Sequence, residues 1–323
     1  MKAVTVAEFG PPESLRWAEM PAPQPGPGQV AIRVRAAGLN FADTLMVAGK
    51  YQVKPDLPFV PGMEAAGEVI ACGAGVTRFR PGDRVMAVCD SGAFAEQAVA
   101  HESAVYAIPE AMDFATAATF PIVYGTAHLA LGARGRLKPG ETLLVHGAAG
   151  GVGLAAVEIG KRMGATVIAT AGSAEKLALA RAHGADHVID YTAGPFIDAV
   201  KDIGLADAVF DPVGGDVFDQ SLRCVNWEAR ILVIGFAAGR IPQAPANILL
   251  VKNVDVVGVF WGAYRRRAPQ QVRDGIEELL GWWREGALKP HVSMTFPAQR
   301  TAEAMAALLG RATTGKVAIA LEG

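Results

Sequence analysis

The segment His146-Gly-Ala-Ala-Gly-Gly-Val-Gly153 constrains the fold of this chain more than any other stretch. It follows an apolar run, Thr142–His146, and precedes a stretch with helical spacing, Leu154–Met163. From Ala148 it reads A-x-G-x-x-G, a variant of the glycine fingerprint that joins a strand to a helix in dinucleotide-binding domains. Because a predicted strand and a predicted helix flank it, we predict a nucleotide site here. A glycine-rich turn without a ligand is the alternative.

Each position of this segment has its own expected role. Gly150 lets the main chain approach a pyrophosphate, and Gly153 lets the helix pack closely against the strand. The N-terminus of the helix that follows has free main-chain N–H groups and a partial positive charge, which favour phosphate. We therefore predict that Ala148, Gly150, Gly151 and Val152 bind a cofactor.

The alternation of strands and helices continues after this segment. The helix predicted over Ala174–His183 ends at Gly184, as a glycine at the C′ position would end it. The further predicted strands are Thr166–Thr170, His187–Asp190, Ala206–Phe210, Arg230–Ile234 and Val254–Val259. Strands that alternate with helices of this length indicate βαβ units on a doubly wound parallel sheet, a Rossmann domain.

The chain before the nucleotide segment has a different pattern, with short β-like runs separated by Pro and Gly turns. The predicted strands there are Val30–Val34, Val85–Val88 and Phe94–Val99, with a helix near Ala42–Ala48. Short strands at this spacing favour a partly open β-barrel or a sandwich. The C-terminal part returns to a mixed pattern, with elements at Gln270–Arg284, Thr301–Leu309 and Lys316–Leu321.

Composition narrows the class of protein. The 323 residues are roughly twice the length of one typical domain, and 51% apolar with 19% charged residues excludes a disordered chain. A net charge of −2 gives no general attraction for nucleic acid or an anionic membrane. We expect no signal peptide and no membrane span. The three scattered cysteines exclude a disulfide framework and favour a cytoplasmic location.

The residues after the second strand of the Rossmann pattern decide which dinucleotide is preferred. An NAD site places Asp or Glu there, to accept a hydrogen bond from the ribose hydroxyl. This chain has Gly172 and Ser173 instead, followed by Lys176, which would attract a 2′-phosphate. We therefore predict NADPH rather than NADH. The alternative for Lys176 is a solvated helix lysine.

Two patterns that suggest other chemistry are set aside. Gly310–Lys316 resembles a phosphate-binding P-loop, but Val317 replaces the required Ser or Thr and a helix precedes the segment. His183 and His187 have the i, i+4 spacing of a metal pair, but Gly184 ends the helix between them. The chain also has no Tyr-x-x-x-Lys pair, which argues against the catalytic dyad of short-chain dehydrogenases.

Six stretches together resemble the medium-chain dehydrogenase/reductase superfamily and, within it, the zinc-free quinone oxidoreductases of the zeta-crystallin type. The stretches are Gly38-Leu-Asn-Phe-Ala-Asp43, Pro61-Gly-Met-Glu64, Phe79-Arg-Pro-Gly-Asp83, Tyr124-Gly-Thr126, Ala148–Gly153 and Gly172-Ser-Ala-Glu-Lys176. The resemblance covers essentially the whole chain. It implies a GroES-like, partly open β-barrel catalytic domain (1–123 and 262–323) around an inserted Rossmann domain (124–261), with substrate between them.

The departures from the zinc enzymes of this superfamily bear on the chemistry. Zinc-dependent relatives have a ligand cysteine where this chain has Asn40 and a histidine where it has Met63, and neither replacement is a credible zinc ligand. Without a metal acid, hydride transfer to a simple ketone is difficult, because a localised alkoxide forms. A quinone or an enone forms a delocalised anion instead, so a zinc-free site suits those acceptors.

The resemblance also implies roles for individual residues. Asn40 and Tyr51 are expected to line the substrate site, and Asp43 to lie beside them. For the cofactor, it implies that Thr126 contacts the nicotinamide carboxamide and that Arg311 reaches the cofactor from the C-terminal part. The 2′-phosphate and adenine-ribose pocket is expected at Gly172, Ser173, Lys176 and Tyr191. Main-chain contacts to the nicotinamide are expected after the fifth strand, at Phe236, and after the sixth strand, at Phe260 and Trp261. The alternative for each is structural, such as a turn residue at Asn40, a loop-packing residue at Tyr51 or a surface charge at Arg311.

We therefore expect an NADPH-dependent, zinc-independent reductase of quinones or other electron-poor conjugated carbonyls, without a bound metal. One alternative is an enoyl-thioester or 2-alkenal reductase, with Tyr51 as the proton donor. Another is a nucleotide-binding structural or RNA-binding protein of the zeta-crystallin type. The resemblance further implies a homodimer formed through edge strands, with Val254–Val259 as the candidate interface.

Overall fold

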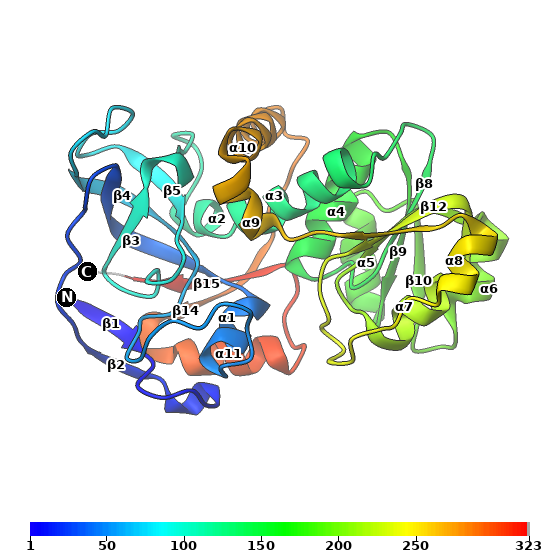
Figure 1. Cartoon of the computed structure of the whole chain (residues 1–323), viewed down its shortest axis with the longest axis horizontal. Coiled ribbons are helices and arrows are strands. Elements are labelled where there is room, and N and C mark those ends of the chain that lie inside the picture. Colours follow the sequence, from blue (N-terminus) through cyan, green and yellow to red (C-terminus); the bar gives the residue numbers. More distant parts are fainter. Residues whose placement is uncertain (322–323) are drawn as a thin grey trace. The chain divides into compact units, whose positions relative to one another are not determined.

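The computed structural model describes residues 1–321 and divides them into two compact units (Figure 1). One unit comprises Met1–Ile122 and the chain from Pro290 onward, and the other comprises Val123–Lys289. The second unit is thus inserted into the sequence of the first. Across residues 1–321 no helix combines the length and the apolar character that a membrane span needs.

The inserted unit is built on a six-stranded sheet in the order β10-β9-β8-β11-β12-β13, with every pair parallel. Its strands are β8 (Thr142–Val145), β9 (Thr166–Ala171), β10 (His187–Asp190), β11 (Ala206–Asp211), β12 (Val225–Val233) and β13 (Asp255–Gly258). The strands are apolar on both faces because helices cover both, which is typical of parallel sheets. The strand order reverses between β8 and β11, where nucleotides bind in doubly wound sheets.

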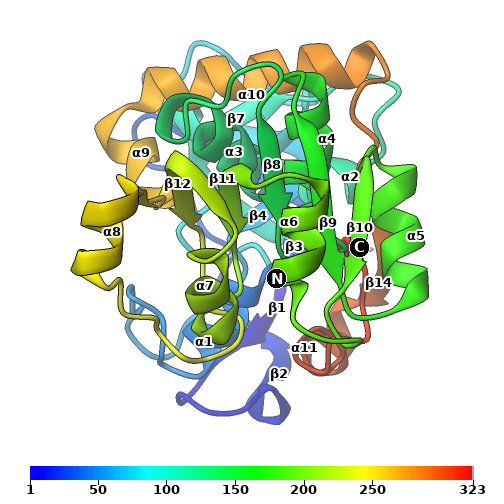
Figure 2. The same cartoon turned by 90° about the vertical axis from the view of Figure 1, so that its right-hand side faces the viewer.

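The helices of this unit are α3 (Pro121–Leu129), continued by a π-helical turn (Ala130–Arg134), α4 (Gly151–Arg162), α5 (Ala174–Ala182), α6 (Phe196–Ile203), α7 (Gly215–Ser221), α8 (Ala246–Lys252), α9 (Trp261–Arg267) and α10 (Pro269–Arg284). Of these, α4 to α8 contact strands of the sheet (Figure 2). The Rossmann fold predicted from the alternating pattern is confirmed. The predicted strands and helices of this unit are all present, with ends that shift by a few residues.

The last two of these helices correct the predicted domain boundary. The prediction placed the chain from Gly262 onward in the barrel domain, but α9 and α10 belong to the inserted unit, which ends at Lys289. A Cβ atom added to Gly125 of α3 would lie 2.8 Å from the indole of Trp261, so the two helices are in close contact. His128 Nε2 also lies 3.0 Å from Glu278 Oε2 of α10. These contacts between segments far apart in the sequence leave no local signal.

The first unit contains a seven-stranded, mostly antiparallel sheet in the order β14-β15-β3-β4-β5-β7, with β6 paired to β3, and a two-stranded sheet, β1-β2. Its strands are β1 (Lys2–Thr5), β2 (Arg16–Glu19), β3 (Gln29–Leu39), β4 (Glu64–Cys72), β5 (Arg84–Val88), β6 (Gln97–His101), β7 (Val105–Ala107), β14 (Val292–Pro297) and β15 (Lys316–Ala320). Its α-helices are α1 (Phe41–Val47), α2 (Phe114–Ala118) and α11 (Thr301–Leu309). This arrangement agrees with the predicted barrel-like domain.

The long pair β3 and β4 depends on a close approach between the two strands. A Cβ atom at Gly67 of β4 would lie 1.9 Å from the carbonyl oxygen of Arg33 on β3. Only glycine fits such a contact, so the sequence Ala65-Ala-Gly67 forms a central strand despite its low strand propensity. For the same reason, residue propensity did not predict β4.

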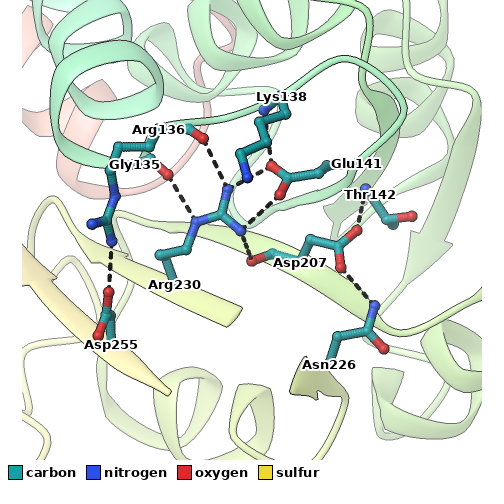
Figure 3. A network of polar contacts seen from close by, with 9 residues as sticks. All are labelled: Gly135, Arg136, Lys138, Glu141, Thr142, Asp207, Asn226, Arg230 and Asp255. Carbon is teal, nitrogen blue, oxygen red and sulfur yellow. Dashed lines mark hydrogen bonds and ion pairs between the residues drawn. The ribbon is translucent and has the colours of Figure 1, made fainter. Parts of the chain in front are cut away.

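A polar network joins the amino ends of the parallel strands (Figure 3). Arg230 of β12 donates to both carboxylate oxygens of Glu141, at 3.0 and 2.5 Å, and to the carbonyl oxygens of Gly135 and Asp207, at 2.8 and 3.0 Å. Burial opposes the charge on Glu141, but the hydrogen bonds from Arg230 prevail and lower its pKa. The network lies at the end of the sheet opposite the carboxyl ends of the strands, so it stabilises the fold and does not form part of a nucleotide site.

Candidate functional site

The glycine-rich segment forms a tight turn between β8 and α4. Gly147 has a positive φ of 56°, which glycine adopts without strain. The N–H of Ala148 donates to the carbonyl oxygen of Thr170 on β9 at 3.1 Å, and the N–H of Gly150 donates to that of Gly147 at 2.9 Å. These hydrogen bonds hold the turn at the carboxyl end of β8, where the first N–H groups of α4 lack helical partners and can bind an anion.

Gly150 and Gly153 differ in why glycine is needed. A Cβ atom at Gly153 would lie 2.3 Å from the Gly147 carbonyl oxygen and 2.8 Å from the Ala148 Cα, so this position must be glycine for the turn to form. At Gly150 the nearest atom would be the same oxygen, at 3.3 Å, and the φ of −81° suits any L-residue. A side chain at Gly150 would therefore require only a small shift of this oxygen, whereas one at Gly153 would collide with the main chain.

The residues predicted to contact the 2′-phosphate come together at the carboxyl ends of β9 and β10. Ser173 is the N-cap of α5, and its hydroxyl accepts a hydrogen bond from the N–H of Lys176 at 3.3 Å. A Cβ atom at Gly172 would lie 2.7 Å from the hydroxyl oxygen of Tyr191, so this ring lies against the main chain there. Tyr191 itself is 43% exposed. Gly172, Ser173 and Lys176 are half-buried, and the turn directly after β9 has no carboxylate, while Glu175 lies in the first turn of α5.

The residues predicted to contact the nicotinamide lie in the same unit. Thr126 is half-buried on α3, next to the glycine against which the buried Trp261 packs. Phe236 follows β12 and Phe260 follows β13, and both rings are partly exposed at the carboxyl ends of their strands. A Cβ atom at Gly214 would lie 3.0 Å from the Phe236 ring. These positions surround the carboxyl edge of the sheet, where ligands of doubly wound folds bind.

A buried histidine holds the elements beneath the glycine turn, and residue patterns did not identify its role. His146 Nδ1 lies 3.0 Å from the Thr170 hydroxyl of β9, and its Nε2 lies 2.9 Å from the Ser221 hydroxyl of α7. Burial lowers the pKa of His146 to about 3, so the ring is neutral at physiological pH. A neutral ring with two hydroxyl partners joins three elements and has no charge to offer a ligand.

A second buried group holds α3 beside α4. Glu158 accepts hydrogen bonds from the Tyr124 hydroxyl at 2.7 Å and from the N–H of Lys289 at 3.1 Å, and its Oε1 lies 2.6 Å from His183 Nδ1. Burial, followed by the Glu158 charge, raises the pKa of Tyr124 well above its ordinary value. Tyr124 lies two residues before Thr126, so this network positions the helix that carries the predicted nicotinamide contact.

In the first unit, Asn40 and Asp43 lie at the start of α1. Asn40 is the N-cap residue, and its main-chain N–H donates to Asp43 Oδ2 at 2.8 Å. Asp43 is completely buried, and its Oδ1 has no hydrogen-bond partner among the described residues. Burial raises the pKa of Asp43 to about 7, although the Asn40 N–H and the Lys316 ammonium both favour the charged form. Burial therefore favours the protonated form of Asp43 more than in an exposed aspartate.

Two further charged residues, which the sequence analysis missed as site residues, contact Asn40. Glu64 of β4 is completely buried and accepts a hydrogen bond from Asn40 Nδ2 at 2.9 Å. The ammonium of Lys316, on β15, donates to Asn40 Oδ1 at 2.7 Å and to Glu64 Oε1 at 2.8 Å. In the sequence, Glu64 stands out only as part of the stretch Pro61–Glu64, and Lys316 only as the first residue of a predicted strand and the end of a P-loop-like segment. Their separation of 252 residues left no local signal.

The remaining predicted residues of the first unit lie in varied surroundings. Tyr51 is half-buried in the loop after α1 and packs against the hydrophobic core of this unit, as Met63 also does. Arg311 follows α11, is exposed and has a positive φ of 57°. Within residues 1–321, no three His, Cys, Asp or Glu side chains come together in a way that could hold a metal ion.

Comparison with family models and known proteins identifies the fold family. Residues 151–279 match the zinc-binding dehydrogenase family, and residues 26–110 match the alcohol dehydrogenase GroES-like domain. The chain is 43% identical over 299 residues to quinone oxidoreductase-like protein 2 homolog of Nematostella vectensis, covering 91% of this chain and 82% of that protein.

Solved structures agree with these matches. The quinone oxidoreductase of Escherichia coli complexed with NADPH superposes with a TM-score of 0.94 at 29% identity, over 99% of this chain and all of that chain. The quinone oxidoreductase from Thermus thermophilus, also described in complex with NADPH, gives a TM-score of 0.86 at 35% identity, over 99% of this chain and all of that chain. The chain therefore belongs to the quinone oxidoreductase-like family of the medium-chain dehydrogenase/reductase superfamily.

Proposed function

We propose that this protein is an NADPH-dependent oxidoreductase that transfers hydride to quinones or other electron-poor conjugated carbonyls. The observation that carries the proposal is the glycine turn between β8 and α4: packing requires glycine at Gly153, whereas a Cβ atom at Gly150 would meet its nearest atom at 3.3 Å, so the demand for glycine from packing is much weaker there. The NADPH-bound structures of two quinone oxidoreductases with the same fold support the choice of cofactor.

The residues present fit NADPH. Gly151 and Val152 begin α4 and offer main-chain N–H groups to the pyrophosphate. We assign the 2′-phosphate to the turn after β9, where Ser173 caps α5 and Lys176 lies in the first turn of that helix. When bound, NADPH supplies the hydride. The reaction then consumes one proton and converts a quinone to a hydroquinone.

Metal independence is part of the same proposal. Met63 packs against the hydrophobic core, and Asn40 has its side chain in contact with Lys316 and Glu64. Zinc prefers cysteine, histidine or carboxylate ligands, and neither Met63 nor Asn40 provides one. With no metal to stabilise a localised alkoxide, an acceptor that spreads its negative charge over a conjugated system reacts more readily. The protein then contributes position and desolvation.

An enoyl-thioester or 2-alkenal reductase is the second candidate, and Tyr51 is the residue that favours it. A saturated carbon product needs a proton delivered to carbon, and Tyr51 is a half-buried phenol close in sequence to Asn40. Steady-state rates with a quinone, an alkenal, an enoyl-CoA and a saturated ketone separate the candidates. A quinone preference supports the first, and a strong enoyl-CoA preference replaces it with the second.

A protein that binds nucleotide without turnover is the candidate from another class, with a structural or RNA-binding role. Its signature is tight NADPH binding with no oxidation by any member of the same acceptor panel. A net charge of −2 does not favour RNA as a partner. A small-molecule acceptor therefore remains the proposed partner.

We further propose a homodimer formed through β13. This strand ends the parallel sheet and pairs only with β12 among the described residues, so one of its edges is open. The neighbouring helix α8 exposes Leu250 (78%) and Val251 (73%). Apolar side chains beside an open strand edge favour association with a second copy. Sedimentation tests this, and Val257→Pro is expected to yield monomer.

A cytoplasmic location completes the proposal. Cys72, Cys89 and Cys224 are all thiols outside disulfides, and two of them are buried. Cysteines that remain as thiols agree with a reducing compartment. Fractionation of cells that produce the protein tests this location, and recovery in a secreted fraction contradicts it.

A further inference from the structure

Lys316 is a buried lysine whose three ammonium hydrogens all have acceptors. Only 7% of the residue is exposed. Its Nζ donates to the Leu39 carbonyl oxygen at 2.8 Å, to Asn40 Oδ1 at 2.7 Å and to Glu64 Oε1 at 2.8 Å. A buried ammonium is costly unless it is fully paired. Because no hydrogen remains for a ligand, Lys316 acts on its surroundings and does not bind substrate or phosphate.

The position of Lys316 is set by the main chain on both sides. Gly315, directly before it, has a φ of 54°, and a Cβ atom there would lie 2.2 Å from the His291 carbonyl oxygen. The same oxygen accepts the Lys316 N–H at 2.8 Å. The Gly-Lys pair at the start of β15 therefore directs the lysine toward α1 and β4. Sequence analysis excluded a P-loop here and gave Gly315 and Lys316 no other role. In the structure, these two residues place the lysine side chain beside Asn40 and Glu64.

Lys316 and Glu64 together permit only one orientation of the Asn40 amide. The amide oxygen faces the ammonium, and the amide nitrogen faces the carboxylate. If the amide were turned by half a rotation, its NH₂ would face the three donors of Lys316, and its oxygen would face the carboxylate of Glu64. Both contacts would be repulsive. The second oxygen of Glu64 accepts the N–H of Ile122 at 3.0 Å, so the carboxylate is itself held in place.

We propose that Lys316 and Glu64 are positioning residues that hold the Asn40 side-chain amide in one orientation for the acceptor. The inference rests on the proposed role of Asn40 at the substrate site. The competing explanation is that Lys316 and Glu64 only stabilise the folded protein and have no effect on the function of Asn40. A buried ion pair, however, often contributes little net stability compared with a well-packed neutral pair of similar volume. A neutral replacement of both residues therefore separates the two explanations.

The double variant Lys316→Met/Glu64→Gln provides that replacement. It removes both charges at once and nearly conserves volume. The side-chain oxygen of the introduced glutamine can still accept the Ile122 N–H, which turns its NH₂ toward Asn40. The Asn40 oxygen must then face this NH₂, so the amide inverts. We expect kcat for the acceptor to fall about 10- to 100-fold with the NADPH KM within about twofold of wild type.

Two readouts accompany the kinetics. Denaturant unfolding is expected to show the double variant closer to wild type than Lys316→Met, which leaves Glu64 buried and unpaired. The NMR resonances of the Asn40 side-chain NH₂, assigned by their loss in Asn40→Ser, report the inversion without any turnover. The matched control is Arg35→Met/Glu68→Gln, which removes a half-exposed ion pair between β3 and β4. It is expected to change neither kcat nor the Asn40 resonances.

The outcomes separate this inference from the proposed function. If wild type reduces no conjugated acceptor, the proposed function fails, while a shift of the Asn40 resonances still supports positioning. Unchanged resonances in the double variant overturn the positioning inference. Shifted resonances with a wild-type kcat overturn its functional part. Should the double variant not fold, the wild-type protein carries the test: NOEs from the Asn40 NH₂ to the side-chain protons of Glu64 support the orientation, and NOEs to the side-chain protons of Lys316 instead overturn it.

Discussion

Gly150→Ala and Gly153→Ala are expected to damage different properties of the same turn. A Cβ atom at Gly153 would lie 2.3 Å from the Gly147 carbonyl oxygen and 2.8 Å from the Ala148 Cα. Both are main-chain atoms held by hydrogen bonds, to Gly150 and to Thr170, so they cannot withdraw freely. Overpacking of this kind costs about 1–3 kcal/mol, offset by the helix propensity of alanine by less than about 1 kcal/mol. We expect a net loss of about 1–2 kcal/mol in unfolding free energy.

Gly150→Ala meets the same oxygen only at 3.3 Å, with a backbone conformation that alanine adopts. Its unfolding free energy is expected to stay within about 1 kcal/mol of wild type. The added methyl group would instead occupy the space through which a pyrophosphate approaches the main chain. Loss of even one charge-assisted hydrogen bond there, worth about 1.5–3 kcal/mol, weakens NADPH binding about tenfold or more.

Urea unfolding without cofactor and fluorescence titration with NADPH measure the two effects separately. The expected pattern is a lower urea midpoint for Gly153→Ala, and a near-wild-type midpoint with a raised NADPH Kd for Gly150→Ala. Wild-type affinity in Gly150→Ala would refute the assignment of this turn as the pyrophosphate site. Wild-type stability in Gly153→Ala would refute the packing argument.

Three further predictions concern the choice of cofactor, the pH dependence of stability and proton transfer to the acceptor. Lys176→Ala should raise the NADPH KM about tenfold and leave the NADH KM nearly unchanged, since only NADPH carries the 2′-phosphate; equal effects in steady-state assays would contradict the assignment. Burial raises the pKa of Asp43 from 3.8 to about 7. Between these pH values Asp43 is protonated in the folded state and ionised in the unfolded state, so the free energy of unfolding falls as the pH rises. Asp43→Asn should therefore gain stability relative to wild type from pH 4 to pH 7 in urea unfolding, and a constant difference would argue against the shifted pKa. Tyr51→Phe should slow alkenal reduction but leave quinone reduction almost unchanged, and an equal loss in both assays would remove Tyr51 as a proton donor to carbon.

Local patterns predicted the parallel sheet and the glycine turn because their determinants are contiguous in sequence. The run Thr142–His146 and the glycines after it lie within a dozen residues, and the segment forms β8, the turn and the start of α4. The helix predicted over Ala174–His183 is likewise present as α5, and its end before Gly184 was read from adjacent residues. Such features depend on neighbours along the chain, so one sequence is enough to predict them.

Features that depend on distant partners were missed. Lys316 gains its role only when β15 pairs with β3 and brings it to Asn40, 276 residues earlier in the chain. His146 lies at the start of the glycine-rich segment, yet its partners Thr170 and Ser221 come from β9 and α7. The assignment of α10 to the barrel domain failed for the same reason. Its contacts with α3 cross more than a hundred residues and leave no periodic pattern.

The central claim is hydride transfer from NADPH to a conjugated acceptor without a metal. It is tested most directly by following the absorbance of NADPH during reduction of a simple quinone by enzyme that has been dialysed against a chelator and shown by elemental analysis to be free of zinc. We predict full quinone-dependent oxidation of NADPH by this metal-free enzyme and no activity with a saturated ketone. Activity that disappears with the metal and returns with added zinc, or that favours the saturated ketone, would contradict it.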